Sequence, residues 1–384
     1  MSDWKKIRLE ELVEESRGLT YGVVQPGDFT DNGVPFIRVN NIVDKNFTEI
    51  AKIEYSVESS YNRSRLQGNE LLITLVGTLG IVEKANEKMI GWNVARAIGV
   101  IQISENYDKD WLFLCLKSPI TQKKIKELAN ITVQPTLNLK ELGSLELEYL
   151  DNEGERFKIK QVIASFDKKI EYNISLNDTI TALTEAIFRK IYRDTEGVGT
   201  FGDLTTQVST RLGEQVDTEK ITVLSAVKTG HLVRTEDYFS KQVSSDDLSN
   251  YKRVAPLSFA YNPARANIGS MGMNDLDTEG AVSPVYEVFR AKEGYHYWIL
   301  MALKHPNIKR GIEGLCSGTV RQNLKYSDLA SLNIKIPTET DIALFNTEYE
   351  TLRKRYNHNL RQNETLIALR DGLLPKLMTG KITL

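Results

Sequence analysis

The sequence lacks the residues on which several common kinds of site depend. Its only cysteines, Cys115 and Cys316, lie far apart without CxxC spacing, so neither a disulfide framework nor a zinc site is encoded. Both are expected to be buried, reduced thiols. The four histidines have no metal-ligand spacing either, so no metal is expected. These histidines are His231, His296, His305 and His358.

Membrane-spanning and catalytic motifs are also missing. No apolar stretch is long enough to cross a bilayer, and residues 1–15 have no apolar core of signal-peptide length, so a cytoplasmic protein is expected. No Pro-Pro pair occurs, which excludes the Asn/Asp-Pro-Pro-aromatic motif of an adenine methyltransferase; Asn262-Pro263 predicts only a turn after a strand. Gly77-Thr-Leu-Gly80 lacks the rest of a dinucleotide or P-loop motif and predicts a tight turn. No catalytic residue is therefore assigned.

An excess of positive charge is absent too. Lys and Arg number 49 against 51 Asp and Glu, so the formal net charge is -2 and the pI is about 6.2. A protein that grips nucleic acid alone usually has a basic face, because phosphate neutralisation supplies most non-specific affinity. The balance predicts either a locally basic groove or a partner that shares the electrostatic work.

What the sequence does contain is an internal repeat. Residues 132–147, TVQPTLNLKELGSLEL, align without gaps on residues 319–334, TVRQNLKYSDLASLNI. Because the domain bodies around the two copies have diverged widely, the conserved segments are expected to have a structural or backbone-contact role.

Each copy runs into a long segment with apolar residues at three- and four-residue steps, 155–192 and 339–378, which predicts two long helices. Their stripes match at an offset of 186 residues and continue over several heptads, which favours mutual packing over two independent amphipathic helices. The matched positions are Ile159/Phe345, Phe166/Leu352, Ile170/Tyr356, Ile180/Leu366, Leu183/Leu369, Ile187/Leu373 and Ile191/Leu377.

A polar pair, Asn173 and Asn359, interrupts both stripes at the same place. A buried asparagine costs stability but fixes register and partner orientation, and this is one interpretation. A tolerated polar residue near a solvated end is the other. The residues assigned to the helix-pair core are Ile159, Phe166, Ile170, Asn173, Ile180, Ile187, Leu352, Tyr356, Asn359, Leu366 and Leu373.

The predicted fold class is α+β: two α/β heads, each followed by a long spacer helix, with the helices packed as an antiparallel coiled coil of pseudo-two-fold symmetry. Head 1 comprises residues 1–150, the first spacer helix 151–193, a linker 194–199, head 2 residues 200–337, and the second spacer helix and tail 338–384. Expected strands are 71–75, 94–101, 257–261 and 285–289, and expected head helices are 111–116 and 298–303.

This plan suggests a reader of DNA with two different heads. A spacer of about 36 residues spans roughly 54 Å, or about one and a half turns of B-DNA. Two heads of different sequence would then read two different half-sites, giving an asymmetric, bipartite target.

Base-edge contacts favour Arg, Lys, Asn, Gln and small polar residues on loops. Taken singly, each candidate is more simply explained as a solvated cation or a local ion pair, and phosphate contacts should outnumber base contacts. The DNA-binding candidates are Arg17, Tyr21, Arg38, Asn40, Asn41, Arg63, Arg65 and Arg96 in head 1, and Arg211, Lys228, His231, Arg234, Lys252, Arg253, Arg265 and Arg321 in head 2.

Over its whole length the chain resembles the specificity subunits of type I restriction-modification systems. The resemblance rests on the duplicated plan and on three motifs whose order makes them specific together. These are GVPFIRVNNI at 33–42, GNELLITLVGTLG at 68–80 and LLPKLMTGKI at 373–382.

The resemblance implies a subunit that reads a two-part DNA sequence through two target recognition domains. It also implies two partner modification subunits that transfer methyl from S-adenosylmethionine to adenine, and restriction subunits that can join them. No cofactor is expected in this chain itself. The main alternative is a non-catalytic, two-headed scaffold that binds proteins. A stand-alone DNA-modifying enzyme would need a catalytic motif that is missing.

Overall fold

The computed structural model describes residues 4–129, 135–213, 221–227, 230–238, 247–316 and 323–384. These residues form two compact units, Met1–Asn173 with Arg361–Leu384 (unit 1) and Ile174–Leu360 (unit 2). Two long helices, α6 (Glu153–Asp194) and α12 (Glu339–Met378), each run through both units. Each unit therefore consists of one head and one half of each long helix.

In unit 1, nine strands form three sheets. The strands are β1 Trp4–Arg8, β2 Leu19–Tyr21, β3 Val34–Ile37, β4 Lys52–Ile53, β5 Leu71–Thr74, β6 Val82–Lys84, β7 Asn93–Val94, β8 Ile98–Ile101 and β9 Glu146–Leu150. The sheet orders are β1-β9, β2-β8-β5-β6 and β4-β3-β7. All pairs are antiparallel except β3 and β7, which are parallel.

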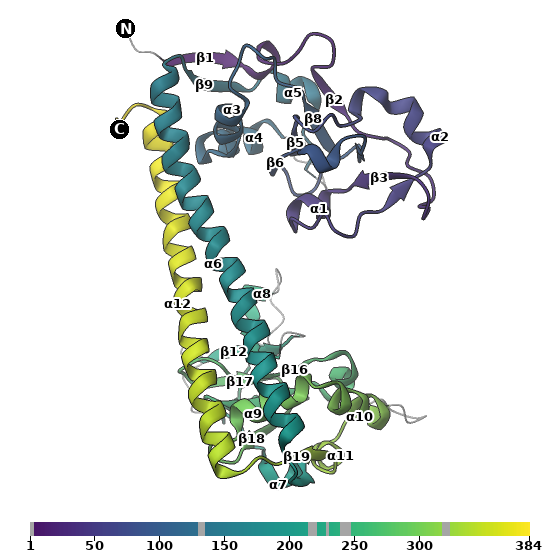
Figure 1. Ribbon diagram of the computed structural model, residues 1–384, viewed down its shortest axis with the longest axis vertical. Coiled ribbons are helices and arrows are strands. Elements are labelled where there is room, and N and C mark those ends of the chain that lie inside the picture. Colours follow the sequence, from purple (N-terminus) through teal and green to yellow (C-terminus); the bar gives the residue numbers. More distant parts are fainter. Residues whose placement is uncertain (1–3, 130–134, 214–220, 228–229, 239–246, 317–322) are drawn as a thin grey trace. The chain divides into compact units, whose positions relative to one another are not determined.

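Five helices accompany these sheets: α1 Val39–Val43, α2 Tyr55–Glu58, α3 Lys109–Lys117, α4 Pro119–Leu128 and α5 Leu139–Gly143. Helices α3 and α4 lie between α6 and the four-stranded sheet, while the β4-β3-β7 sheet with α1 and α2 lies farthest from the long helices (Figure 1). The core of unit 1 contains residues of the head and of both long helices. Fully buried Trp111 of α3 belongs to the same cluster as Ile159 and Ile163 of α6 and Leu374 and Leu377 of α12.

Unit 2 has a similar order of elements, with one more strand in its third sheet and, within the described residues, no helix at the place of α1. Its strands are β10 Val198–Thr200, β11 Thr205–Val208, β12 Thr222–Ala226, β13 Leu232–Arg234, β14 Lys252–Val254, β15 Ser258–Tyr261, β16 Met271–Met273, β17 Gly280–Val282, β18 Glu287–Ala291 and β19 Asn333–Lys335. The sheet orders are β10-β19, β11-β18-β15-β16 and β13-β12-β17-β14, with β12 and β17 parallel.

The helices of head 2 are α7 Phe201–Leu204, α8 Thr235–Tyr238, α9 His296–Lys304, α10 Pro306–Cys316 and α11 Tyr326–Ala330. Trp298 of α9 occupies the place that Trp111 has in α3, 187 residues earlier, and packs against Phe188 of α6 and Phe345 of α12 with ring centroids 4.7 and 5.6 Å away. The same indole donates a hydrogen bond to the Lys335 carbonyl oxygen at 2.9 Å. Both heads thus anchor on the long helices through a tryptophan.

The predicted α+β class and the packing of two long helices are confirmed, and the helix ends follow from local capping. The Thr338 hydroxyl accepts a hydrogen bond from the Asp341 amide at 3.2 Å at the start of α12, and Gly380 just beyond its end has a φ of 65°. One strand prediction is wrong. Residues 94–101 form parts of two strands in different sheets, because a turn closed by the Ile98 amide and the Ala95 carbonyl lets the chain leave β7 for β8.

Candidate functional site

Two pairs of buried asparagines join α6 to α12, one pair in each unit. In unit 1, Asn173 donates a hydrogen bond from Nδ2 to Oδ1 of Asn363 at 2.8 Å. In unit 2, Asn359 donates from Nδ2 to Oδ1 of Asn177 at 2.8 Å. All four side chains are less than a tenth exposed. Within unit 1, Asp167 also pairs with Arg370, and within unit 2, Phe188 also contacts Phe345. In each unit, residue numbers therefore rise on one helix as they fall on the other, and the helices are antiparallel.

Further bonds hold each pair in place. Asn173 Nδ2 also donates to Gln362 Oε1 at 2.9 Å, and Asn177 Nδ2 donates to the Tyr356 carbonyl at 3.3 Å. A buried amide without a partner costs about 1–3 kcal/mol, so these bonds penalise any shift of register between the helices. Asn173 and Asn359 are buried, which agrees with the first of the two interpretations of the sequence, that of a buried asparagine. Asn177 and Asn363, one helical turn later, were missed, although they too match at the offset of 186.

The other residues assigned to the helix-pair core are buried or half-buried. Ile159 and Ile180 are buried, and Phe166, Ile170, Ile187, Leu352, Tyr356, Leu366 and Leu373 are half-buried. The stripe pair Leu183 and Leu369 differs, being 47% and 54% exposed. Their predicted burial is wrong, because both residues lie on the outward side of their helices.

Charged contacts add to the apolar contact between each head and the long helices. In unit 1, Asp108 at the start of α3 forms ion pairs with Lys160 and Arg156 of α6. In unit 2, Arg353 of α12 forms an ion pair with Asp275 and donates to the Tyr297 hydroxyl at 2.9 Å. Each head is therefore fixed to its helix segments by polar bonds of defined geometry as well as by its tryptophan.

The predicted candidate His231 belongs to this second polar cluster. Its Nδ1 lies 3.6 Å from Oδ2 of Asp275. Burial, followed by the nearby charges of Lys304 and Arg353, lowers the pKa of His231 to about 4. At neutral pH the imidazole is therefore uncharged, which suits a packed junction better than a phosphate contact. The sequence indicated His231 but neither Asp275 nor Arg353, whose partners lie far away along the chain.

In head 1 the structure brings Arg17, Arg63 and Arg65 together. Arg17 Nη1 lies 3.1 Å from Oε1 of the fully buried Glu70 and donates from Nη2 to the carbonyl oxygens of Arg63 and Arg65. Arg63 returns a bond to the Arg17 carbonyl at 2.9 Å, and Arg65 forms an ion pair with Glu58. Glu70 also accepts three backbone amides. The side-chain donors of these three arginines are therefore used in hydrogen bonds and ion pairs that hold loops of the head.

Among the other candidates of head 1, some side chains contact protein groups and others, within the described residues, do not. Asn41 is buried, and its Oδ1 accepts from the Arg38 amide at 2.8 Å, which caps α1. The Arg38 guanidinium lies 5.4 Å from the ring centroid of Phe29, and the Tyr21 hydroxyl accepts from the Leu139 amide at 3.1 Å. Asn40 and Arg96 are exposed, and within the described ranges their side chains make no hydrogen bond or ion pair.

In head 2 most candidates also have protein partners. Arg211 donates to Asn250 Oδ1 at 3.1 Å, Lys252 to the Tyr286 carbonyl at 2.5 Å, and Arg253 forms an ion pair with Glu279 at 2.6 Å. Arg234 is exposed beside Glu236, 4.0 Å away. Arg265 is exposed without a side-chain partner in the part of the chain that is described. Lys228 and Arg321 lie outside the described residues.

The described parts of the repeat segment, residues 135–147 and 323–334, contribute leucines to the cores, whereas Thr132, Val133, Thr319 and Val320 lie outside the described residues. Leu137, Leu142 and Leu145 in the first copy and Leu324 and Leu329 in the second are at most 1% exposed. The carbonyl of Leu324 accepts the Tyr261 hydroxyl at 3.2 Å. These contacts give the segment the structural role expected from its conservation.

Both cysteines are buried and free, as predicted. In the described ranges, no group of three or more His, Cys, Asp or Glu side chains is arranged to hold a metal ion. None of the helices within those ranges combines the length and apolarity needed to cross a membrane.

Comparison with known proteins places this architecture among DNA specificity proteins. Residues 1–185 match the family model described as the type I restriction modification DNA specificity domain. The chain is 30% identical over 213 residues to the type I restriction enzyme EcoBI specificity subunit of Escherichia coli, an alignment that covers 53% of this chain and 43% of that subunit.

Other relatives match over the full length. The HindI specificity subunit of Haemophilus influenzae is 21% identical over 100% of both chains, and the MjaIX specificity subunit of Methanocaldococcus jannaschii is 21% identical over 99% of this chain and 94% of that subunit. The crystal structure of the type I restriction-modification S subunit from M. genitalium has the same fold, with a TM-score of 0.56 and 14% identity over 97% of this chain and 96% of that one.

The fold consists of two units with a repeated framework and heads of different sequence. Residues 1–185 thus resemble the type I restriction modification DNA specificity domain, and the whole chain is similar in sequence to type I specificity subunits.

The asparagine pairs predict a coupled effect on stability. Asn177→Leu leaves the buried Nδ2 of Asn359 without its acceptor and should lower the free energy of unfolding by about 1–3 kcal/mol. Asn177→Leu combined with Asn359→Leu should restore much of that loss, because two apolar side chains then face each other. Chemical denaturation of the two single variants and the double variant measures the coupling.

Asp178→Ala, an exposed neighbour, is the matched control and should change stability by no more than about 0.5 kcal/mol. Additive losses from the two asparagine substitutions would contradict the proposed bond.

Proposed function

We propose that this chain is a specificity subunit that reads an asymmetric, two-part DNA sequence, one part with each head, and recruits two modification subunits that methylate adenine. Restriction subunits join the same assembly through these partners. The observation that carries the proposal is that the buried framework of the two heads matches, while their exposed polar residues differ. Equal frameworks with unequal surfaces suit a task in which each head binds a different stretch of one ligand.

Exposed polar residues support the DNA-reading part of the proposal. Among the described residues, the side chains of Asn40, Arg96 and Arg265 make no hydrogen bond or ion pair with the protein, so their donors are free for base edges or phosphates. Arg234 is also exposed and lies 4.0 Å from Glu236. Arg17, Arg63 and Arg65 would serve by fixing the loops that present such residues. Apart from the buried Asn41 and the uncharged His231, the predicted set remains the proposed DNA surface.

Exposed apolar residues on the long helices support the recruitment of two equal partners. Ile174 is 52% exposed and its match in the second helix, Leu360, is 43% exposed; Leu183 and Leu369 form the next such pair. A contiguous exposed apolar patch marks a protein interface, and we propose that these residues belong to one such patch on each long helix. Since they recur at equivalent positions, one kind of partner would be bound twice.

The chemistry belongs to the partners in this proposal. This chain is proposed to be non-catalytic, with S-adenosylmethionine held by the modification subunits, and to act in the cytoplasm, where chromosomal DNA is available. Its near-neutral charge then has a consequence: alone it should bind DNA weakly, because the partners complete the positive surface around the duplex.

Methylation mapping tests the proposal directly. The chain is expressed together with its candidate modification subunit, and methylated adenines are mapped across the host genome. One split, asymmetric motif is expected, and it should disappear when this chain is omitted. Methylation that persists without the chain would contradict the assignment, and a protein-binding scaffold would leave no sequence-selective methylation at all.

The spacing role of the helices is tested by lengthening both together. Seven residues are inserted between Asp178 and Thr184 of α6, and seven at the opposing residues 352–358 of α12, so that the antiparallel register is kept. One heptad adds roughly 10 Å of helix, so the gap in the recognised sequence should grow by about three base pairs with both half-sites unchanged.

The same seven residues placed after Gly380 are the control and should leave the gap as it was. Methylation mapping again gives the readout. Altered half-site sequences in the lengthened variant would contradict the assignment of heads and spacers.

A further inference from the structure

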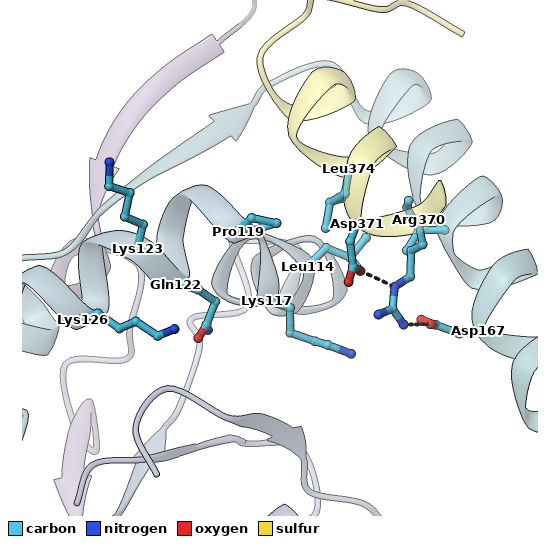
Figure 2. A pocket seen from close by; sticks show the side chains of 11 residues that line it. Leu114, Lys117, Pro119, Gln122, Lys123, Lys126, Asp167, Arg370, Asp371 and Leu374 are labelled. Carbon is cyan, nitrogen blue, oxygen red and sulfur yellow. Dashed lines mark hydrogen bonds and ion pairs between the residues drawn. The ribbon is translucent and has the colours of Figure 1, made fainter. Parts of the chain in front are cut away.

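Each unit has a groove where its head meets the long helices. Groove 1, of about 500 Å³, is lined in part by Leu114, Lys117, Ile163, Asp167, Arg370 and Leu374 (Figure 2). Groove 2, of about 550 Å³, is lined in part by Glu185, Leu300, Leu303, Lys304, Ile312 and Glu313. Both combine aliphatic walls with charged side chains.

The two grooves are built from matching positions. Lys117 is the last residue of α3 and Lys304 the last residue of α9, 187 residues later. Each groove also has one carboxylate at a matching place on a long helix, Asp371 in groove 1 and Glu185 in groove 2. The cation is thus retained in both copies, whereas Lys126 of groove 1 is replaced by Glu313 in groove 2.

Within the described residues, the two retained lysines have carboxylates nearby but none within ion-pair distance. Figure 2 shows Arg370 bonded to both carboxylates of groove 1, at 2.6 Å to Asp167 and 2.9 Å to Asp371, while Lys117 extends beside them. In the described part of the chain, the Nζ atoms of Lys117 and Lys304 make no hydrogen bond or ion pair; that of Lys117 lies 4.8 Å from the Phe113 ring centroid. Partial burial lowers the pKa of both lysines.

A half-buried, unpaired ammonium group is costly, and an incoming anion would relieve that cost. The other lining residues indicate which anion fits. Aliphatic walls suit an inserted apolar side chain, which a protein segment offers and a phosphodiester backbone does not. A protein segment with a carboxylate next to an aliphatic side chain therefore matches both grooves better than DNA does.

We propose that grooves 1 and 2 are twin docking sites, each of which receives the same acidic-aliphatic segment of one modification subunit, with Lys117 and Lys304 as the two charge anchors. This inference rests on the proposed function, since it assumes that two copies of one partner bind. Beyond the proposed function, the inference gives the location of the two binding sites, grooves 1 and 2, and the acidic-aliphatic segment by which the partner is recognised.

The test uses the full-length chain with its co-expressed modification subunit. Charge reversals Lys117→Glu and Lys304→Glu are compared with Lys168→Glu and Lys190→Glu, which alter exposed lysines of α6 outside the grooves. Native mass spectrometry counts the modification subunits bound to each chain, and a titration gives the affinity of each site.

Wild type and both control variants should bind two modification subunits. Each groove reversal should weaken one site by roughly tenfold or more, so that one partner remains, and the double reversal should bind none. Lys117→Met and Lys304→Met keep the apolar stems and should weaken the same sites less. If the Met variants also weaken binding, the lost charge is responsible rather than misfolding, because these variants keep the apolar stems.

Two partners bound with unchanged affinity in every groove variant would overturn the inference. If partner binding is unchanged and the slope of DNA affinity against salt instead falls by about one per lysine, then the lysines contact phosphate and the inference is wrong. Failure of the proposed function looks different, because the wild-type chain itself would then bind no modification subunit.

Discussion

The antiparallel pairing of α6 and α12 is the constraint on which the rest of the structure depends. Each head completes its core with residues of both long helices, so a change of register between the helices would disrupt both cores. The buried bonds Asn173–Asn363 and Asn359–Asn177 oppose such a change, because a shifted register leaves polar amides without partners. Apolar contacts alone would oppose a shift of register between α6 and α12 less strongly, because one aliphatic contact resembles the next.

With this framework fixed, the exposed parts of the heads are free to differ. The tryptophans Trp111 and Trp298 and the buried leucines of the repeat segment hold each head to its helices in the same way. Residues that face solvent, such as Arg96 and Arg265, are not part of this buried framework. This separation suits the proposed reading of DNA, because surface residues can change without loss of the fold. The same separation leaves the proposed partner surfaces duplicated and constant.

The sequence predicted the framework well because its signal is periodic and duplicated. Matching stripes revealed both long helices, and Asn173 and Asn359 stood out as interruptions. Leu183 and Leu369 were misassigned, since a match between copies does not reveal which side of a helix faces its partner. The ion pairs Arg17–Glu70 and Arg65–Glu58 could not be predicted, because loop geometry brings these residues together and no periodic pattern encodes it. The choice between structural and DNA-facing arginines depends on such geometry.

A cross-linking measurement of helix register tests the central claim most directly. Cysteines introduced together at Asn173 and Asn363 should cross-link efficiently, because these residues face each other between the helices, and native Cys115 and Cys316 are buried and do not interfere. Cysteines at Asn173 and Ile367, one turn out of register, should cross-link poorly. Efficient cross-linking of the second combination, or equal yields from both, would contradict the register that joins the two heads in this account.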